Sequence, residues 1–381
     1  MTHWRMTHWR SFSARVRGVW RRGGGAQPGR LRGRVVCGWV ALAAVAAGGA
    51  SAQGLGPGAF ARMGMGARSL ALPAQVADRS GLASPYLNPA LAPFQPAQGV
   101  ELSAGLLAFD RQWQAVQVAA PLRPRSGFAG GVVRGGVGNI DGRDASGRPT
   151  DGPSEDGTYA SDEYAFFAAF GAQLSGRVSG GAGLRLYRNE LFDGVSAPTA
   201  IGVSLGLSAR VTDRLAVGLA ADDLFARYEW NTSGSVAASA TDYFPTRLRG
   251  GAAWTSGTRS GDRPRLTVAA EAELSVQRAQ AVRPGGVDVV GTSASPRSVT
   301  LDYRLADVQG RLGAEYWLVD GFAVRGGLDR VGAGAAGELR PSAGFGLEQR
   351  FTELDVRVDY AVVVEPFGSA LMHMATVRLG L

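Results

Sequence analysis

Apolar and polar side chains alternate at every second position over long stretches of this chain. The clearest stretch covers residues 353–364, where the two parities carry different chemistry: apolar Leu354, Val356, Val358, Tyr360, Val362 and Val364, against charged Glu353, Asp355, Arg357 and Asp359. Side chains of a β-strand point alternately to its two faces, so this stretch predicts a strand with one apolar face and one charged face.

The same alternation recurs from Gly99 to the C-terminus. We expect fourteen strands, at residues 99–109, 112–122, 127–139, 162–174, 177–190, 199–210, 213–224, 245–256, 263–277, 305–317, 320–330, 339–350, 353–364 and 370–381. Strands of roughly ten to thirteen residues, tilted by about 40°, cross an apolar layer of about 25 Å. Strands of soluble proteins average about five or six residues, which argues against the alternative of a secreted β-sandwich. The pattern predicts an all-β fold, a transmembrane antiparallel β-barrel of about fourteen strands.

The connections between the expected strands alternate in length. Short ones lie at 123–126, 175–176, 211–212, 318–319 and 351–352, and long polar ones at 140–161, 191–198, 225–244, 278–304 and 331–338. Bacterial membrane barrels have short periplasmic turns and longer external loops. We therefore expect the long connections to share the external end of the barrel; the short junction at 110–111 departs from this rule.

The two faces of the strands predict where charged and aromatic side chains lie. An arginine that faces lipid at the bilayer midplane costs about 2–4 kcal/mol, so we expect charged wall positions such as Glu271 and Arg325 to face the lumen. Asp222 and Asp223 stand at a strand end, where we expect contact with water. Aromatic residues near strand ends are expected in interfacial girdles: Trp113, Tyr164, Trp254, Tyr316, Trp317 and Phe345.

Residues 1–52 predict an export signal and leader. Arginines between positions 30 and 34 precede the apolar run 35–47, and Ala50-Ser51-Ala52 supplies small residues for cleavage between Ala52 and Gln53. The single cysteine, Cys37, lies inside this signal, so we expect no disulfide in the exported part.

The leader also accounts for the formal net charge of +8. It holds nine of the 40 basic residues and none of the 32 acidic ones, which leaves 31 basic residues and a net charge of −1 in the remainder. The basic balance therefore reflects targeting and gives no reason to expect a nucleic-acid partner. Arg21-Arg22 offers the alternative of twin-arginine export, although the pair stands far from the apolar run.

Residues 53–98 do not alternate and contain six prolines. Eight strands already nearly fill a barrel lumen with their own side chains, so fourteen strands enclose a space that a further segment must fill. We expect a plug at 53–98 inside a barrel formed by 99–381, after the signal peptide and leader at 1–52. A periplasmic N-terminal extension is the alternative for 53–98.

Catalytic chemistry has little support in the sequence. His373 is the single histidine after the leader, and nucleophile–base catalysis usually requires a histidine beside the nucleophile. We expect a wall or rim histidine and no enzyme activity, with an outer-membrane phospholipase as the alternative. The acidic stretch 141–162 has oxygen ligands suited to calcium but fits no EF-hand spacing, so we expect a solvated loop, no metal site and no cofactor.

Two motifs within 53–98 resemble a known family. Gly66-Ala67-Arg68-Ser69-Leu70, followed by Asn88-Pro89-Ala90, is similar to the opening of the PorV/PorQ family, within the FadL-like outer-membrane proteins. The resemblance implies fourteen strands, a plug inside the lumen and a place in the outer membrane of a Gram-negative cell. Pro73-Ala74-Gln75 stands where the family has Gly-Gly-Ala, and Leu87 replaces its aromatic residue, so the plug contacts are expected to differ.

The resemblance also implies a function. PorV-like members are associated with type IX secretion, in which a barrel receives secreted proteins that carry a sorting domain and passes them to surface attachment; we favour this function. A FadL-like protein would instead pass hydrophobic molecules such as long-chain fatty acids, with Met63, Met65, Leu72 and Leu91 lining a pocket. A structural barrel without cargo is the third candidate. The partners implied are outer-membrane lipid, the barrel-assembly machinery, secretion components or sorting domains, and a hydrophobic ligand.

Overall fold

The computed structural model describes residues 56–144, 146–152, 158–191, 197–232, 238–259, 263–290, 293–332, 339–352, 354–365 and 370–381. The expected leader, with its cleavage position between Ala52 and Gln53, lies outside these residues. Within the described part of the chain, none of the helices combines the length and the apolar character needed to cross a membrane.

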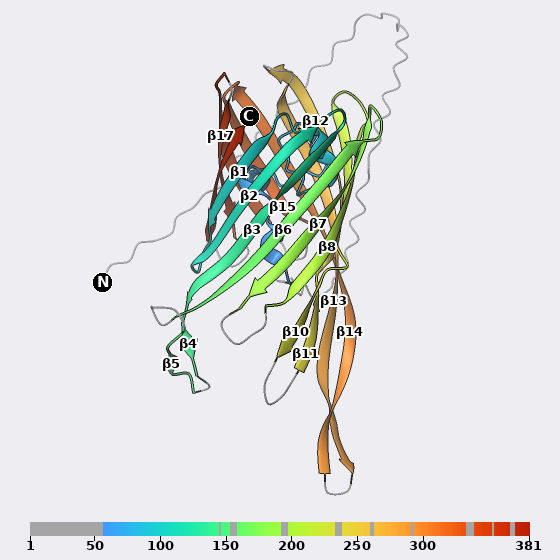
Figure 1. Cartoon of the computed structure of the whole chain (residues 1–381), viewed down its shortest axis with the longest axis vertical. Helices are drawn as coiled ribbons and strands as arrows, with labels where there is room; N and C mark the ends of the chain where they lie inside the picture. Colours follow the sequence, from blue (N-terminus) through green and yellow to red (C-terminus); the bar gives the residue numbers. More distant parts are fainter. Residues whose placement is uncertain are drawn as a thin grey trace, which may run out of the picture. The chain divides into compact units, whose positions relative to one another are not determined.

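Fourteen strands close into one antiparallel barrel (Figure 1). They are β1 (Gly99–Leu106), β2 (Arg111–Leu122), β3 (Ser126–Ile140), β6 (Tyr159–Gln173), β7 (Val178–Glu190), β8 (Thr199–Arg210), β9 (Leu215–Leu224), β12 (Thr246–Arg259), β13 (Arg263–Val290), β14 (Ser293–Val319), β15 (Phe322–Val331), β16 (Arg340–Arg350), β17 (Asp355–Val364) and β18 (Leu371–Gly380). Each strand pairs with the next in this order, and β1 closes the ring on β18, with Gly99 opposite Gly380. The predicted fold class is confirmed.

The strand ends differ from the expected ones by three residues or fewer, except where β13 meets β14. Residues 278–304, expected as a loop, continue the ladder of these two strands as far as Val290 opposite Ser293. The pairing of β13 with β12 ends at Val276, and that of β14 with β15 ends at Gly310, so the outer arms form a two-stranded ribbon. The loop prediction is wrong here: the two arms pair with each other as an antiparallel ladder beyond their last partners in the wall.

Two smaller hairpins occupy other long connections. β10 (Arg227–Thr232) pairs with β11 (Ala238–Tyr243), and β4 (Gly142–Arg143) pairs with β5 (Pro149–Thr150). Figure 1 shows both hairpins and the β13–β14 ribbon at the end of the barrel opposite the C-terminus. We call this end the hairpin end; it is the end at which the long connections were expected.

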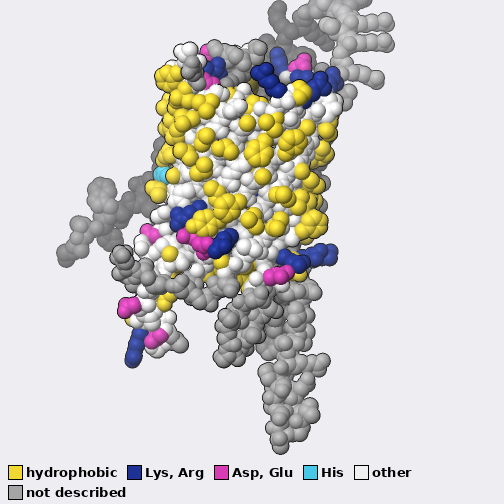
Figure 2. Space-filling model, in the orientation of Figure 1, with side chains coloured by type: hydrophobic (Ala, Val, Ile, Leu, Met, Phe, Trp, Pro, Cys, Tyr) yellow, Lys and Arg dark blue, Asp and Glu magenta, His cyan; other side chains and the backbone are white. Residues whose placement is uncertain are grey.

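The wall separates apolar from charged side chains as the alternation predicted. On β17, Arg357 and Asp359 are buried inside the barrel, whereas Val358 between them is exposed on the outer surface. On β13, Glu271 is likewise buried and Leu274 is exposed. Figure 2 shows the result on one face of the molecule, a broad apolar belt bounded at both ends by charged side chains. This is the outer surface of a transmembrane barrel.

Two of the six aromatic residues expected in interfacial girdles lie elsewhere. Trp113 and Trp317 are fully buried, and their parity places them on the lumenal face of β2 and β14. The indole N–H of Trp113 donates to the carbonyl oxygen of Phe60 at 3.0 Å. Their assignment to a girdle is wrong, because a position near a strand end does not decide whether the side chain faces the lumen or the lipid. Trp254, Tyr316 and Phe345 do lie exposed on the outer surface.

The segment that begins at Gly56 lies inside the barrel. It contains the 3₁₀-helix η1 (Ala59–Arg62), the α-helix α1 (Gly66–Ala71) and the 3₁₀-helix η2 (Pro89–Phe94). α1 packs on β1 and on β15 to β18, while η2 packs on β2, β3 and β6 to β8, so the two halves of the plug contact different arcs of the wall. Most of its side chains are buried, as a plug requires.

Candidate functional site

The interface between the plug and the wall concentrates the buried polar groups of the molecule. Its first half is formed by α1, which carries the Gly66–Leu70 motif. Gly66 has a left-handed φ of 83°, and a Cβ there would lie 2.7 Å from the hydroxyl oxygens of Ser103 and Thr376. The next residue, Ala67, donates its backbone N–H to Thr376 Oγ1 at 2.8 Å. Glycine is therefore needed at this position both for its conformation and for the close approach to β1 and β18.

Arg68 joins α1 to the wall through buried ion pairs. Its Nη2 lies 2.7 Å from Asp78 within the plug, and its Nε lies 3.0 Å from Glu315 on β14. Burial lowers the pKa of Arg68, but the attraction of Glu315 and Asp78 outweighs burial and raises this pKa above its ordinary value. The guanidinium therefore stays charged and holds the motif at a fixed place on the wall.

Wall residues extend this ion-pair network around Glu315. Arg325 on β15 lies 2.6 Å from Glu315 and 2.8 Å from Asp359 on β17. Arg357 in turn lies 2.8 Å from Asp359. All four side chains are almost completely buried, so each charge depends on its partners instead of water for stabilisation. We call the set Arg68, Asp78, Glu315, Arg325, Arg357 and Asp359 the Arg68 network.

The Asn88-Pro89-Ala90 motif forms the second half of the interface. The Asn88 side chain caps η2 by accepting the N–H of Ala90 at 3.0 Å, and it donates to the carbonyl oxygens of Val76 at 2.7 Å and Leu207 at 3.3 Å. On the wall, Ser179 donates to the carbonyl oxygen of Ala90 at 2.9 Å. A single asparagine thus fixes a helix start, a plug loop and β8 together.

A row of four glycines lies beneath this motif. Gly127, Gly171, Gly181 and Gly206 stand opposite one another on β3, β6, β7 and β8. A Cβ on Gly181 would lie 2.5 Å from the carbonyl carbon of Pro89, and the other three would clash with plug atoms as well. The glycine row lets the plug backbone lie directly on the wall. The sequence showed only scattered glycines, because their alignment depends on the register of four strands.

Asp222 and Asp223 were expected to meet water, and that expectation is wrong. Both are fully buried at the end of β9. Arg185 on β7 lies 3.2 Å from Asp222 and 3.1 Å from Asp223, and Arg249 on β12 lies 2.7 Å from Asp222. The strand ends inside the plugged part of the barrel, where opposite charges replace water.

These arginines also reach the plug backbone. Arg185 donates to the carbonyl oxygen of Tyr86 at 2.7 Å, and Arg249 donates to that of Leu87. Here the wall residue is the acceptor: Glu271 accepts hydrogen bonds from the backbone N–H groups of Gln75 at 3.1 Å and Val76 at 3.0 Å. Charged wall side chains therefore satisfy plug backbone groups that are not paired in a helix or strand.

The structure places the four residues expected to line a hydrophobic pocket in both halves of the plug. Leu72 packs against the wall at Gly313, whereas Leu91 belongs to η2 on the other arc of the barrel; both are fully buried. Met65 is buried in the main apolar cluster and Met63 packs against it. The pocket remains a prediction.

The remaining motif residues, Ser69 and Leu70, lie on α1, and the Ser69 hydroxyl donates to the carbonyl oxygen of Met65 at 2.9 Å.

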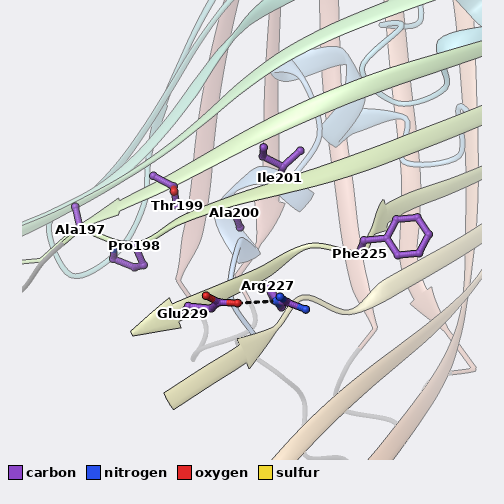
Figure 3. A pocket seen from close by; sticks show the side chains of 8 residues that line it. All are labelled: Ala197, Pro198, Thr199, Ala200, Ile201, Phe225, Arg227 and Glu229. Atoms are coloured by element: carbon purple, nitrogen blue, oxygen red, sulfur yellow. Dashed lines mark hydrogen bonds and ion pairs between the residues drawn. The ribbon is translucent and has the colours of Figure 1, made fainter. Parts of the chain in front are cut away.

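The cavities of the described residues differ greatly in size. Inside the barrel, a cavity of about 10 Å³ is lined mostly by polar side chains, among them Arg68, Glu101 and Arg357. On the outside, a depression of about 690 Å³ lies between the start of β8 and β10 (Figure 3). A volume of about 10 Å³ is close to the least that holds one water molecule. This cavity therefore has no room for a ligand larger than water.

His373 lies outside this interface. It is exposed on the outer face of β18, where its Nδ1 lies 2.6 Å from the hydroxyl of Tyr360. Ser369 stands four residues before it, too close in sequence to suggest a nucleophile–base pair. In the described ranges, no group of three histidine, cysteine or acidic side chains is placed to hold a metal ion. In the acidic stretch 141–162, Asp141, Asp144 and Asp151 are exposed, whereas Asp162 is half-buried.

Comparisons with known proteins give the fold. No protein-family model matches the chain, and a search among curated proteins finds no match. Among solved structures, the toluene transporter TbuX of Ralstonia pickettii superposes with a TM-score of 0.53 at 16% identity, over 84% of this chain and 98% of that one. The toluene transporter TodX of Pseudomonas putida gives a TM-score of 0.50 at 12% identity, over 83% and 96%. At these identities the likeness concerns the fold alone.

Proposed function

We propose that this chain is a non-enzymatic outer-membrane barrel that acts in protein secretion and surface attachment, in the manner of PorV-like proteins. The observation that carries the proposal is the fixed plug: Arg68 pairs with Glu315 of the wall at 3.0 Å, and the wall residues Arg185 and Glu271 bond backbone groups of the plug. A barrel closed in this way offers its surface to partners.

The hairpin end supplies such a surface. The β13–β14 ribbon extends past the wall as a two-stranded structure, and β10–β11 lies in a neighbouring connection. Two-stranded ribbons expose backbone edges to which an extended segment of another protein can add. The Gly66–Leu70 and Asn88–Ala90 motifs support the same family resemblance, because each makes specific contacts with the wall.

A second candidate is passage of hydrophobic small molecules. It is favoured by the fold shared with two proteins described as toluene transporters. For this function, the plug would have to move, because Leu72 and Leu91 are fully buried and Leu72 packs directly against Gly313 of the wall. A structural barrel without cargo is the third candidate.

Affinity purification from native membranes distinguishes the three. The test compares the full chain with a variant in which residues 279–302 are replaced by a short turn, and with a matched control in which residues 144–157 are shortened. We expect secretion components or proteins with sorting domains to be recovered with the full chain and the control but lost with the ribbon variant. Co-purified hydrocarbons or fatty acids without a protein partner would favour the second candidate, and neither kind of partner would favour the third.

A further inference from the structure

The outer depression of about 690 Å³ lies where the wall changes its pairing. The ladder between β8 and β9 begins at Val203 opposite Leu224, so the first residues of β8 extend past the end of β9. After Leu224 the backbone turns through Phe225, which has a left-handed φ of 68°, and continues into β10. Figure 3 shows the depression between these two segments, with Ile201 on β8 and Arg227 on β10.

The depression opens on the outer side of the wall. Along β10, Ala226 and Tyr228 are buried toward the interior, whereas Phe225, Arg227 and Glu229 point the other way and are exposed. Phe225 is 86% exposed, which is unusual for a phenylalanine outside an apolar environment. The site therefore faces the surroundings of the barrel and not its lumen.

The depression straddles the outer limit of the apolar belt. One ladder row on the outer face is apolar across five strands: Val116, Val132, Phe166, Leu186 and Ile201. The outward row one step nearer the hairpin end is polar or interfacial on the same strands: Gln114, Arg134, Tyr164, Arg188 and Thr199. Ile201 and Thr199 both line the depression, so its walls change from apolar to polar at this limit.

At this limit of the apolar belt, exposed arginines form weak ion pairs with exposed acidic side chains. Arg227 lies 2.9 Å from Glu229, and Arg188, whose Cα stands opposite Thr199, lies 2.6 Å from Glu190. Exposed ion pairs of this kind contribute about 0–1 kcal/mol of stability. The guanidinium groups can therefore leave the carboxylate and bind an anion that makes stronger hydrogen bonds. Arginine binds phosphate with two parallel hydrogen bonds.

We propose that the depression binds a phosphorylated lipid of the outer leaflet, as a site distinct from the plug and from the ribbon. One acyl chain lies against Ile201 and Phe225, and the phosphate accepts hydrogen bonds from Arg227 and Arg188. An amphiphile is the occupant that matches a site apolar at one end and with weakly paired arginines at the other. The proposal rests on the outer-membrane location but not on the secretion function.

Native mass spectrometry of the protein in non-ionic detergent tests the site, with diphosphorylated lipid A as the probe. We expect Arg227→Gln to weaken binding about tenfold, the loss of a charge-assisted hydrogen bond. Phe225→Ser should weaken it as well. Glu229→Gln should tighten binding, because it removes the carboxylate that competes for Arg227. Phe225, Arg227 and Glu229 are exposed, so we expect all three variants to fold.

Arg210→Gln is the matched control, since Arg210 is an exposed arginine at the opposite end of β8. It should bind the probe as the unaltered protein does. Equal weakening by Arg210→Gln and Arg227→Gln would overturn the proposal, as would diacylglycerol competing as well as lipid A. A variant that loses lipid binding but keeps its secretion partners would show that the two proposals fail independently. A variant that keeps lipid binding but loses those partners would show the same.

Discussion

At the scale of single residues, the buried arginines fix the position of the plug. A buried ion pair adds little net stability compared with apolar packing, but removing one partner leaves a charge without compensation. Arg68 pairs with Asp78 in the plug and with Glu315 in the wall, so it couples two parts of the chain that are far apart in sequence. The network therefore favours one placement of the plug over others that would bury the same apolar area.

Arg68→Met should destabilise the folded barrel by about 3–5 kcal/mol, because Asp78 and Glu315 each lose a close, buried basic partner. Unfolding by urea in detergent micelles, followed by tryptophan fluorescence, measures the change. Arg210→Met, at an exposed position, is the control and should change stability by less than about 0.5 kcal/mol. An equal change in both variants would mean that the buried network is not what holds the plug.

Gly181→Ala should loosen the second half of the plug. A Cβ at this position would lie 2.5 Å from the carbonyl carbon of Pro89 and 2.7 Å from the nitrogen of Ala90, so η2 must shift. Overpacking of this kind costs about 1–3 kcal/mol. Gly180→Ala is the neighbouring control, since its Cβ would meet Leu174 at 3.3 Å on the outer face. Protease sensitivity within 79–98 should rise in the first variant and stay unchanged in the second.

At the scale of elements, the ribbon and the plug differ in how they are supported. The outer arms of β13 and β14 pair with each other beyond the last partners on β12 and β15. Isolated two-stranded hairpins are marginally stable in water. The plug, in contrast, packs on β1 to β3, β6 to β8 and β15 to β18, and its Gln75 and Val76 bond Glu271 on β13. These differences predict which parts of the chain open first.

Brief trypsin treatment of the detergent-solubilised protein should cut first within 278–304, which contains Arg283 and Arg297. The buried Arg68 and Arg185 should stay uncut until the barrel unfolds, because a protease needs several residues in an extended, accessible form. Mass spectrometry of the fragments gives the order of cleavage. Early cleavage after Arg68 would show that the plug leaves the lumen readily and would favour the small-molecule candidate.

At the scale of the whole molecule, the barrel places an apolar belt outside and a balanced set of charges inside. The belt is continuous on the face shown in Figure 2, and its exposed leucine, valine and phenylalanine side chains come from every part of the wall. An apolar surface of this extent is far larger than the patches that soluble monomers expose. The molecule therefore needs lipid or detergent around it.

Expressed with its leader, the protein should reach the outer-membrane fraction and be extracted only by detergent. Its N-terminus should be Gln53, and the change of net charge from +8 to −1 on loss of residues 1–52 should appear as a strong acidic shift on isoelectric focusing. Recovery in the soluble periplasmic fraction would contradict both the location and the lipid site. An N-terminus other than Gln53 would contradict only the cleavage position.

The sequence by itself determined the strands of the wall and the chemistry of their two faces. Alternation is a local property: whether Val358 faces out and Arg357 faces in depends only on their positions along one strand. Fourteen strand centres could therefore be placed from the chain alone. The family-like motifs likewise marked the segment that forms the plug, because Gly66 and Asn88 have local conformational roles as well as distant contacts.

The tertiary structure alone decided which distant residues meet. The partners of Asp222, the contact of Trp113 with Phe60 and the row that includes Gly181 and Gly206 depend on strand register and on closure of the ring. The paired ribbon and the outer depression depend on where neighbouring strands stop. None of these follows from a pattern of period two, because pairing across the wall joins residues that the chain separates by tens or hundreds of positions.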